Sequence, residues 1–97
     1  MSTNPQAFEV GQTIWLDGRD PRAFPPLTVA NIYLWKEVPR LKITGQLRHG
    51  TKVKVVETQF YNQESRWYYR ISGLLKTGWV PGNFLCARKP GVLGDLV

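Results

Sequence analysis

Apolar and polar residues alternate with a period of two along much of this chain. In residues 52–57 (KVKVVE), Val53 and Val55 fall on one side of the predicted strand, and Lys52 and Lys54 fall on the other. That alternation is typical of a half-buried β-strand. No window of about eleven residues repeats apolar positions at helical spacing without an intervening glycine or proline. The pattern therefore predicts an all-β chain.

Short strands are predicted wherever such runs stand between turn-forming residues. They cover residues 13–16, 28–34, 42–47, 52–58, 67–72, 77–80 and 84–88. The residues on the apolar side of each alternation form the predicted core, which consists of Ile32, Leu34, Ile43, Leu47, Val53, Val55, Ile71, Val80 and Leu85.

One predicted strand stops at a proline, within residues 77–85 (TGWVPGNFL). Proline lacks the N–H that a strand ladder needs, so Pro81 and Gly82 mark a tight turn between two short strands. We expect this turn to expose Pro81 and Phe84 together.

Three segments resemble, in the same order, the motifs of SH3 barrels and of bacterial SH3-type (SH3b) domains. Residues 77–85 are similar to the Gly-aromatic-aliphatic-Pro-x-Asn-aromatic-aliphatic signature that ends an SH3 barrel. Residues 47–57 (LRHGTKVKVVE) look like the Gly-Thr-x-Val-x-Val segment of SH3b domains, and residues 65–71 (SRWYYRI) like the strand that opens with a tryptophan. The resemblance implies a small SH3-like barrel of five to six antiparallel strands with an N-terminal extension.

The resemblance divides the chain into three parts. Residues 28–88 form the SH3-like domain, residues 1–27 an N-terminal arm and residues 89–97 a flexible C-terminal tail. The arm contains Ile14, Trp15 and Leu16, and leaving such a run in water costs roughly 25 cal/mol per Å² of apolar area. We therefore expect the arm to pack on the barrel as an extra strand, with Trp15 and Phe24 capping the core.

SH3 domains stack prolines on a shallow aromatic groove, and the resemblance implies a similar ligand groove here. The candidate groove residues are Tyr33, Trp35, Trp67, Pro81, Asn83 and Phe84. Trp67, Pro81 and Phe84 occupy positions that match the motifs, whereas the segment around Tyr33 and Trp35 departs from them. Alternation that buries Ile32 and Leu34 sends Tyr33 and Trp35 to the opposite side of their strand. The alternative interpretation is that these aromatic residues simply cover a small core.

The formal net charge of the chain is +6, and its distribution is uneven. Between Lys36 and Lys89, eleven Lys and Arg residues stand against three Glu residues, which gives the barrel a charge of +8. A basic rim is predicted at Lys36, Arg40, Lys42, Lys52 and Lys54. Such a charge favours anionic partners, and the alternative is a solvated surface without a partner.

Few residues suggest chemistry. His49 is the only histidine and Cys86 the only cysteine, and neither has a neighbour at a metal-ligand or catalytic spacing. We therefore predict no enzyme activity, no metal and no cofactor. No stretch of about 18 apolar residues could span a membrane, the N-terminus does not resemble a signal peptide, and a single cysteine fits a reducing compartment. The expected location is cytoplasmic.

The function predicted from these features is that of a non-catalytic SH3-like binding module. It recognises an extended segment of a protein partner through an aromatic groove with a basic rim, and the basic rim favours an acidic segment. One alternative is a small barrel that binds nucleic acid by stacking bases and neutralising phosphates. Further alternatives are a structural subunit and a cell-wall-binding SH3b module. The oligomeric state stays open.

Overall fold

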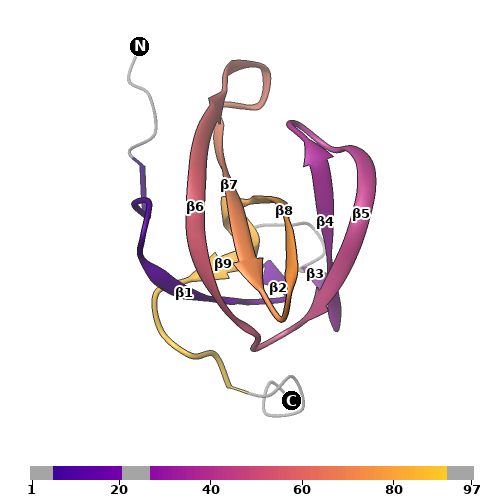
Figure 1. Cartoon of the computed structure of the whole chain (residues 1–97), viewed down its shortest axis with the longest axis vertical. Coiled ribbons are helices and arrows are strands. Elements are labelled where there is room, and N and C mark those ends of the chain that lie inside the picture. The colour runs from indigo at the N-terminus through magenta and orange to yellow at the C-terminus, as the bar shows by residue number, and fades with distance from the viewer. Residues whose placement is uncertain (1–5, 21–26, 92–97) are drawn as a thin grey trace.

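Seven strands form one antiparallel sheet that curls into a half-barrel (Figure 1). The computed structural model describes residues 6–20 and 27–91. The strand order is β5–β4–β8–β7–β6–β1–β9. The strands are β1 (Thr13–Leu16), β4 (Asn31–Glu37), β5 (Leu41–Arg48), β6 (Lys52–Tyr61), β7 (Arg66–Gly73), β8 (Lys76–Pro81) and β9 (Leu85–Cys86).

Four short elements complete the fold. Strands β2 (Arg19–Asp20) and β3 (Leu27–Thr28) pair in a separate two-stranded ribbon. The 3-10 helix η1 (Asn62–Glu64) joins β6 to β7, and the 3-10 helix η2 (Gly82–Phe84) joins β8 to β9. No helix in the described part of the chain is long and apolar enough to cross a membrane.

The predicted all-β fold is confirmed. The seven-stranded sheet includes β1, the extra strand expected from the N-terminal arm, which lies between β6 and β9. Its register places Ile14 opposite Val53 and Leu16 opposite Leu85. Both β1 residues are fully buried, so the N-terminal strand supplies part of the core.

Strand β4 begins at Asn31, three residues later than predicted. The reason is that Thr28 and Val29 form backbone hydrogen bonds or strand pairs with residues 18 and 19 instead of joining β4. Thr28 pairs with Arg19 in the ribbon, and the Val29 N–H donates to the Gly18 carbonyl at 2.9 Å. A Cβ atom on Gly18 would lie 1.8 Å from the Val29 carbonyl oxygen. Only glycine allows the two backbones to approach this closely.

The core lies on the concave side of the sheet, and eight of its nine predicted members are buried. Ile43 is the exception, since 48% of its surface is exposed. The cause is a β-bulge in the β4–β5 pair, where Leu34 lies opposite Gly45 but Trp35 lies opposite Ile43. Skipping one residue moves every side chain beyond the bulge to the other face, and Ile43 consequently points away from the core.

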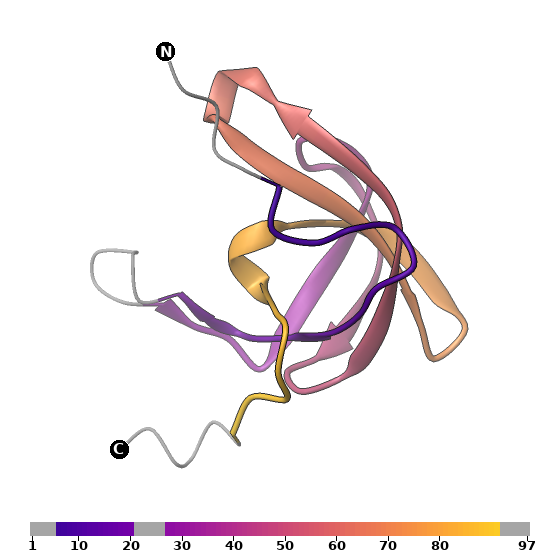
Figure 2. The same ribbon diagram turned by 90° about the vertical axis from the view of Figure 1, so that its left-hand side faces the viewer.

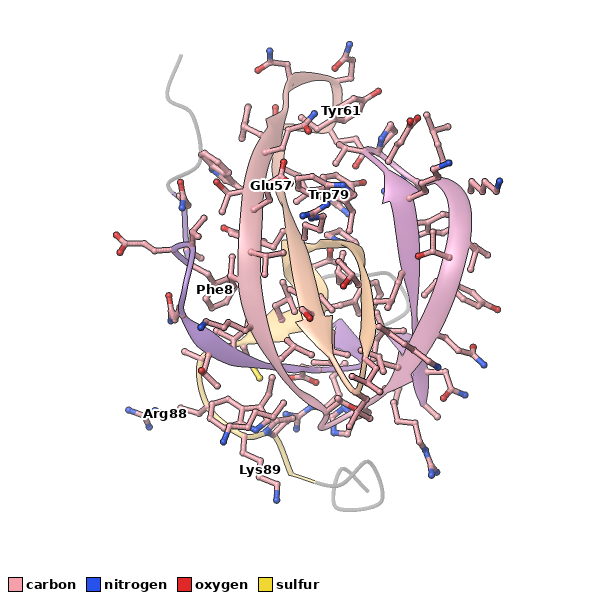
Figure 3. All side chains as sticks on the ribbon, in the orientation of Figure 1. Phe8, Glu57, Tyr61, Trp79, Arg88 and Lys89 are labelled. Carbon is pink, nitrogen blue, oxygen red and sulfur yellow. The ribbon has the colours of Figure 1, made fainter. Side chains whose placement is uncertain are left out.

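The segment before β1 also packs on the barrel, as expected of the N-terminal arm. Phe8, labelled in Figure 3, is buried. Its ring meets that of Tyr69 edge-on at a centroid distance of 5.2 Å. The Ala7 N–H donates to the Tyr69 hydroxyl at 2.9 Å. Phe8 therefore caps the core on this side. Phe24, one of the two predicted caps, lies outside the described residues, and the other, Trp15, is partly buried in β1.

Candidate functional site

Two of the predicted groove residues, Trp67 and Phe84, pack against the core cluster. Strand alternation places Trp67 on the same face of β7 as the buried Tyr69. The two rings stack at a centroid distance of 6.5 Å, and Phe60 meets Trp67 edge-on at 5.4 Å. Trp67 is thus half-buried among aromatic residues at one end of the core.

Pro81 and Asn83 occupy a different environment. Pro81 is buried and lies opposite Tyr68 on β7, while η2 turns Phe84 back towards the core. The predicted joint exposure of Pro81 and Phe84 is therefore wrong. The Asn83 side-chain oxygen accepts a hydrogen bond from Arg66 at 3.3 Å.

Tyr33 and Trp35 point away from the core, as the alternation of β4 predicted. Tyr33 is 51% exposed, and its ring meets that of Trp35 edge-on at 6.1 Å. Trp35 lies opposite Trp79 of β8, which belongs to the same outward face. The six predicted groove residues are consequently divided between two faces of the sheet.

Apolar side chains continue from β4 onto the outward face of the neighbouring strand β5. Ile43 lies opposite Trp35, and Leu41 lies opposite Glu37. Leu41 is 52% exposed and Ile43 48%. We call the residues Tyr33, Trp35, Leu41 and Ile43 the hairpin face. Because β5 is the last strand of the sheet (Figure 1), this apolar strip runs along an edge that pairs with no further strand among the described residues.

A polar network beside the hairpin face joins the β4–β5 turn to β7 through Arg40, Glu64 and Tyr68. The guanidinium of Arg40 forms two bonds to the Glu64 carboxylate, at 2.8 and 3.1 Å. The Tyr68 hydroxyl donates to the same carboxylate at 2.6 Å and is itself contacted by Arg40. Arg40 is therefore neutralised locally by a carboxylate, which distinguishes it from the four lysines of the predicted basic rim.

This network shifts the ionisation of its members. Burial disfavours the charged form of Glu64, but the hydrogen bonds from Tyr68 and Arg40 outweigh burial and hold its pKa below the ordinary value. Burial and the hydrogen bond to Glu64 both raise the pKa of Tyr68. Glu64 is consequently ionised and Tyr68 neutral at physiological pH, which makes the cluster a structural clamp over the buried ring of Tyr68.

The remaining predicted rim residues are exposed but do not form a single rim. Lys36 and Lys42 lie near the turn that joins β4 to β5, whereas Lys52 and Lys54 lie at the start of β6. Figure 1 shows that the end of β4 and the start of β6 are at opposite ends of the barrel. The basic residues therefore form two separate groups.

Ion pairing is uneven among the described side chains. Four arginines form ion pairs, with Asp17, Glu57 or Glu64 as partners. Among the same described side chains, eight Lys and Arg residues form no ion pair, whereas the glutamates without an ion pair are two, Glu9 and Glu37. The excess positive charge is accordingly carried mainly by exposed lysines.

His49 and Cys86 have separate structural partners. The Gly18 N–H donates to His49 Nδ1 at 2.9 Å, so Nε2 carries the proton and donates to the Gly91 carbonyl at 2.7 Å. The Cys86 thiol lies 2.9 Å from the Arg88 carbonyl oxygen, and burial raises its pKa. Residues 6–20 and 27–91 contain no group of three or more His, Cys, Asp or Glu side chains that could hold a metal ion.

Half of the hairpin face, Leu41 and Ile43, and the contacts among Arg40, Glu64 and Tyr68 were not predicted from the sequence. Leu41 and Ile43 carry a clear apolar signal, but the bulge that turns Ile43 outward depends on pairing with β4. The network joins residues 24 and 28 positions apart in the chain. No local pattern brings such positions together.

Comparison with known proteins finds no matching family model, no similar curated protein and no similar solved structure. The resemblance to SH3b domains therefore rests on the three motifs and on the all-β fold.

Proposed function

We propose that this chain is a non-catalytic, SH3-like binding module that recognises an extended segment of a protein partner on the hairpin face. One observation carries the proposal: an apolar strip, with Tyr33, Leu41 and Ile43 each about half exposed, lies along the unpaired edge strand β5. Edge strands offer free N–H and C=O groups, and an added peptide strand satisfies them while its side chains contact the strip. This mode replaces the predicted groove around Trp67 and Phe84.

The partner segment that fits this edge is extended and acidic. Lys36 and Lys42 adjoin the hairpin face, are exposed and form no ion pair among the described residues. Glu37 is the only acidic residue in β4 and β5. Charge complementary to that of the partner raises the association rate, and repulsion between like charges disfavours edge pairing of two copies of this basic chain.

The test is titration of isotopically labelled protein with acidic and neutral extended peptides, followed by amide chemical shifts. Shifts are expected along β5, and Ile43→Ser and Tyr33→Ser are each expected to weaken binding about tenfold, which corresponds to about 1.4 kcal/mol. Val10→Ser is the matched control, because Val10 is 62% exposed and lies outside the hairpin face. Peptides N-methylated at alternate residues should bind weakly if strand addition occurs. Equal binding of methylated and unmethylated peptides would contradict it.

Nucleic-acid binding is the second candidate, and the eight cations without ion pairs among the described residues favour it. It predicts that affinity for single-stranded DNA falls steeply with salt, with a slope of about −0.7 per phosphate contact. Binding of DNA with that slope, without shifts along β5, would support this candidate over peptide recognition.

A further inference from the structure

The turn between β7 and β8 consists of two exposed leucines. Leu74 is 74% and Leu75 105% exposed, the highest values among the large apolar residues of the described chain. Their φ angles are 48° and 64°, in the left-handed region that two-residue hairpin turns usually fill with Asn and Gly. Leucine is an unfavourable residue for this left-handed turn, and both leucine side chains are exposed to water. A requirement for folding therefore does not explain why leucine occupies these two positions.

Basic residues flank this turn on the neighbouring strand. Lys54 lies opposite Ser72, and a Cβ atom on Gly73 would lie 3.0 Å from the Lys52 carbonyl oxygen. Both lysines are exposed and form no ion pair within residues 6–20 and 27–91. No acidic residue occurs in residues 50–56 or 71–82. The apolar tip is thus bordered by positive charge that no nearby carboxylate neutralises.

The turn is also convex. Figure 2 shows the β7–β8 hairpin projecting from one corner of the barrel, at the lower right of the view. A protein partner would need its own pocket for two protruding leucines, whereas a fluid bilayer accepts a convex apolar tip without one. Apolar side chains beside lysines favour the boundary between headgroups and acyl chains of anionic membranes.

We propose that the β7–β8 turn docks the protein on anionic phospholipid surfaces. Leu74 and Leu75 enter the headgroup–acyl boundary, while Lys52 and Lys54 contact anionic headgroups. This docking uses a different part of the molecule from the hairpin face, and neither proposal depends on the other.

The test is co-sedimentation of the full chain with vesicles of phosphatidylcholine, with and without phosphatidylserine. The protein is expected to sediment with the anionic vesicles and to dissociate at high salt. The double variant Leu74→Asn/Leu75→Gly is expected to lower partitioning about tenfold or more, because the inserted apolar area is removed. Lys52→Gln/Lys54→Gln is expected to lower it about fivefold for each lysine replaced.

The leucine variant separates binding from folding. Asn and Gly are the preferred residues for this turn, so its urea midpoint is expected to stay unchanged or rise. Val10→Asn, which alters an apolar residue that is 62% exposed and lies outside both the turn and the hairpin face, is the matched control and should sediment like the unaltered protein. The proposal is overturned if the unaltered chain stays in solution with anionic vesicles, as it would if the tip bound a protein instead. It is equally overturned if the leucine variant sediments as well as the unaltered chain.

Discussion

Replacing Tyr68 by phenylalanine tests the clamp that closes over the outward face of β7. The substitution keeps the fully buried ring and removes only the hydroxyl, which donates to Glu64 at 2.6 Å. A hydrogen bond to a charged acceptor contributes about 1.5–3 kcal/mol. The bidentate contact of Arg40 with Glu64 remains. We therefore expect Tyr68→Phe to lower the free energy of unfolding by about 2 kcal/mol at pH 7.

The same substitution has a predicted pH dependence. The folded state lowers the pKa of Glu64, so its contribution to stability is fully present above the unfolded pKa of about 4.3 and is lost as pH falls through the lower folded pKa. Tyr68→Phe removes one of the hydrogen bonds that lower this pKa. The stability difference between the two proteins is therefore expected to shrink below about pH 4.

Urea unfolding followed by tryptophan fluorescence, at neutral and acid pH, measures both effects. Tyr61→Phe is the matched control, since Tyr61 contacts the Tyr68 ring edge-on and its hydroxyl forms no hydrogen bond within the described residues. That control should change stability by less than about 0.5 kcal/mol. A loss below about 0.5 kcal/mol for Tyr68→Phe, or a loss equal at all pH values, would refute the clamp.

Three further substitutions test the packing. In Gly78→Ala, the new methyl group would lie 2.5 Å from Leu34 Cβ, so urea unfolding should show a loss of about 1–3 kcal/mol; unchanged stability would mean that β4 and β8 separate easily. Trp67→Ala should lower the free energy of unfolding by about 3 kcal/mol and leave the peptide affinity of the folded protein unchanged. Loss of peptide binding by a variant of unchanged stability would show instead that Trp67 lines a ligand groove. His49→Ala removes the acceptor of the buried Gly18 N–H, and its expected cost of about 1–3 kcal/mol is checked by thermal unfolding against His49→Gln.

The sequence predicted the strands well because strand alternation is a local property. The bounds of β1 are confirmed as predicted, and the other strands of the sheet overlap their predicted ranges. The strand predicted at residues 84–88 is shortened because η2 includes Phe84. The alternation of valines in β6 and the end of a strand at Pro81 could be predicted without knowing which strands are neighbours. Each was determined by a residue's own backbone preferences and by a period of two.

The candidate site was predicted less well because its geometry depends on strand pairing. The resemblance placed Trp67 and Tyr33 in one groove, and the structure separates them because β7 and β4 present these residues to opposite faces. Tyr68 was not among the predicted core residues. It is buried because the β4–β5 turn brings Arg40 over it from the next hairpin.

By itself, the sequence determined that this chain is all-β, where most of its strands lie and that its barrel is strongly basic. Those properties follow from backbone preference, periodicity and the count of charged groups. Tertiary structure alone decided that Ile43 faces outward, that Arg40 is neutralised and that Leu74 and Leu75 form a protruding tip. A bulge, an ion pair between distant residues and the shape of a hairpin all depend on strand register, which long-range packing selects and local alternation does not encode.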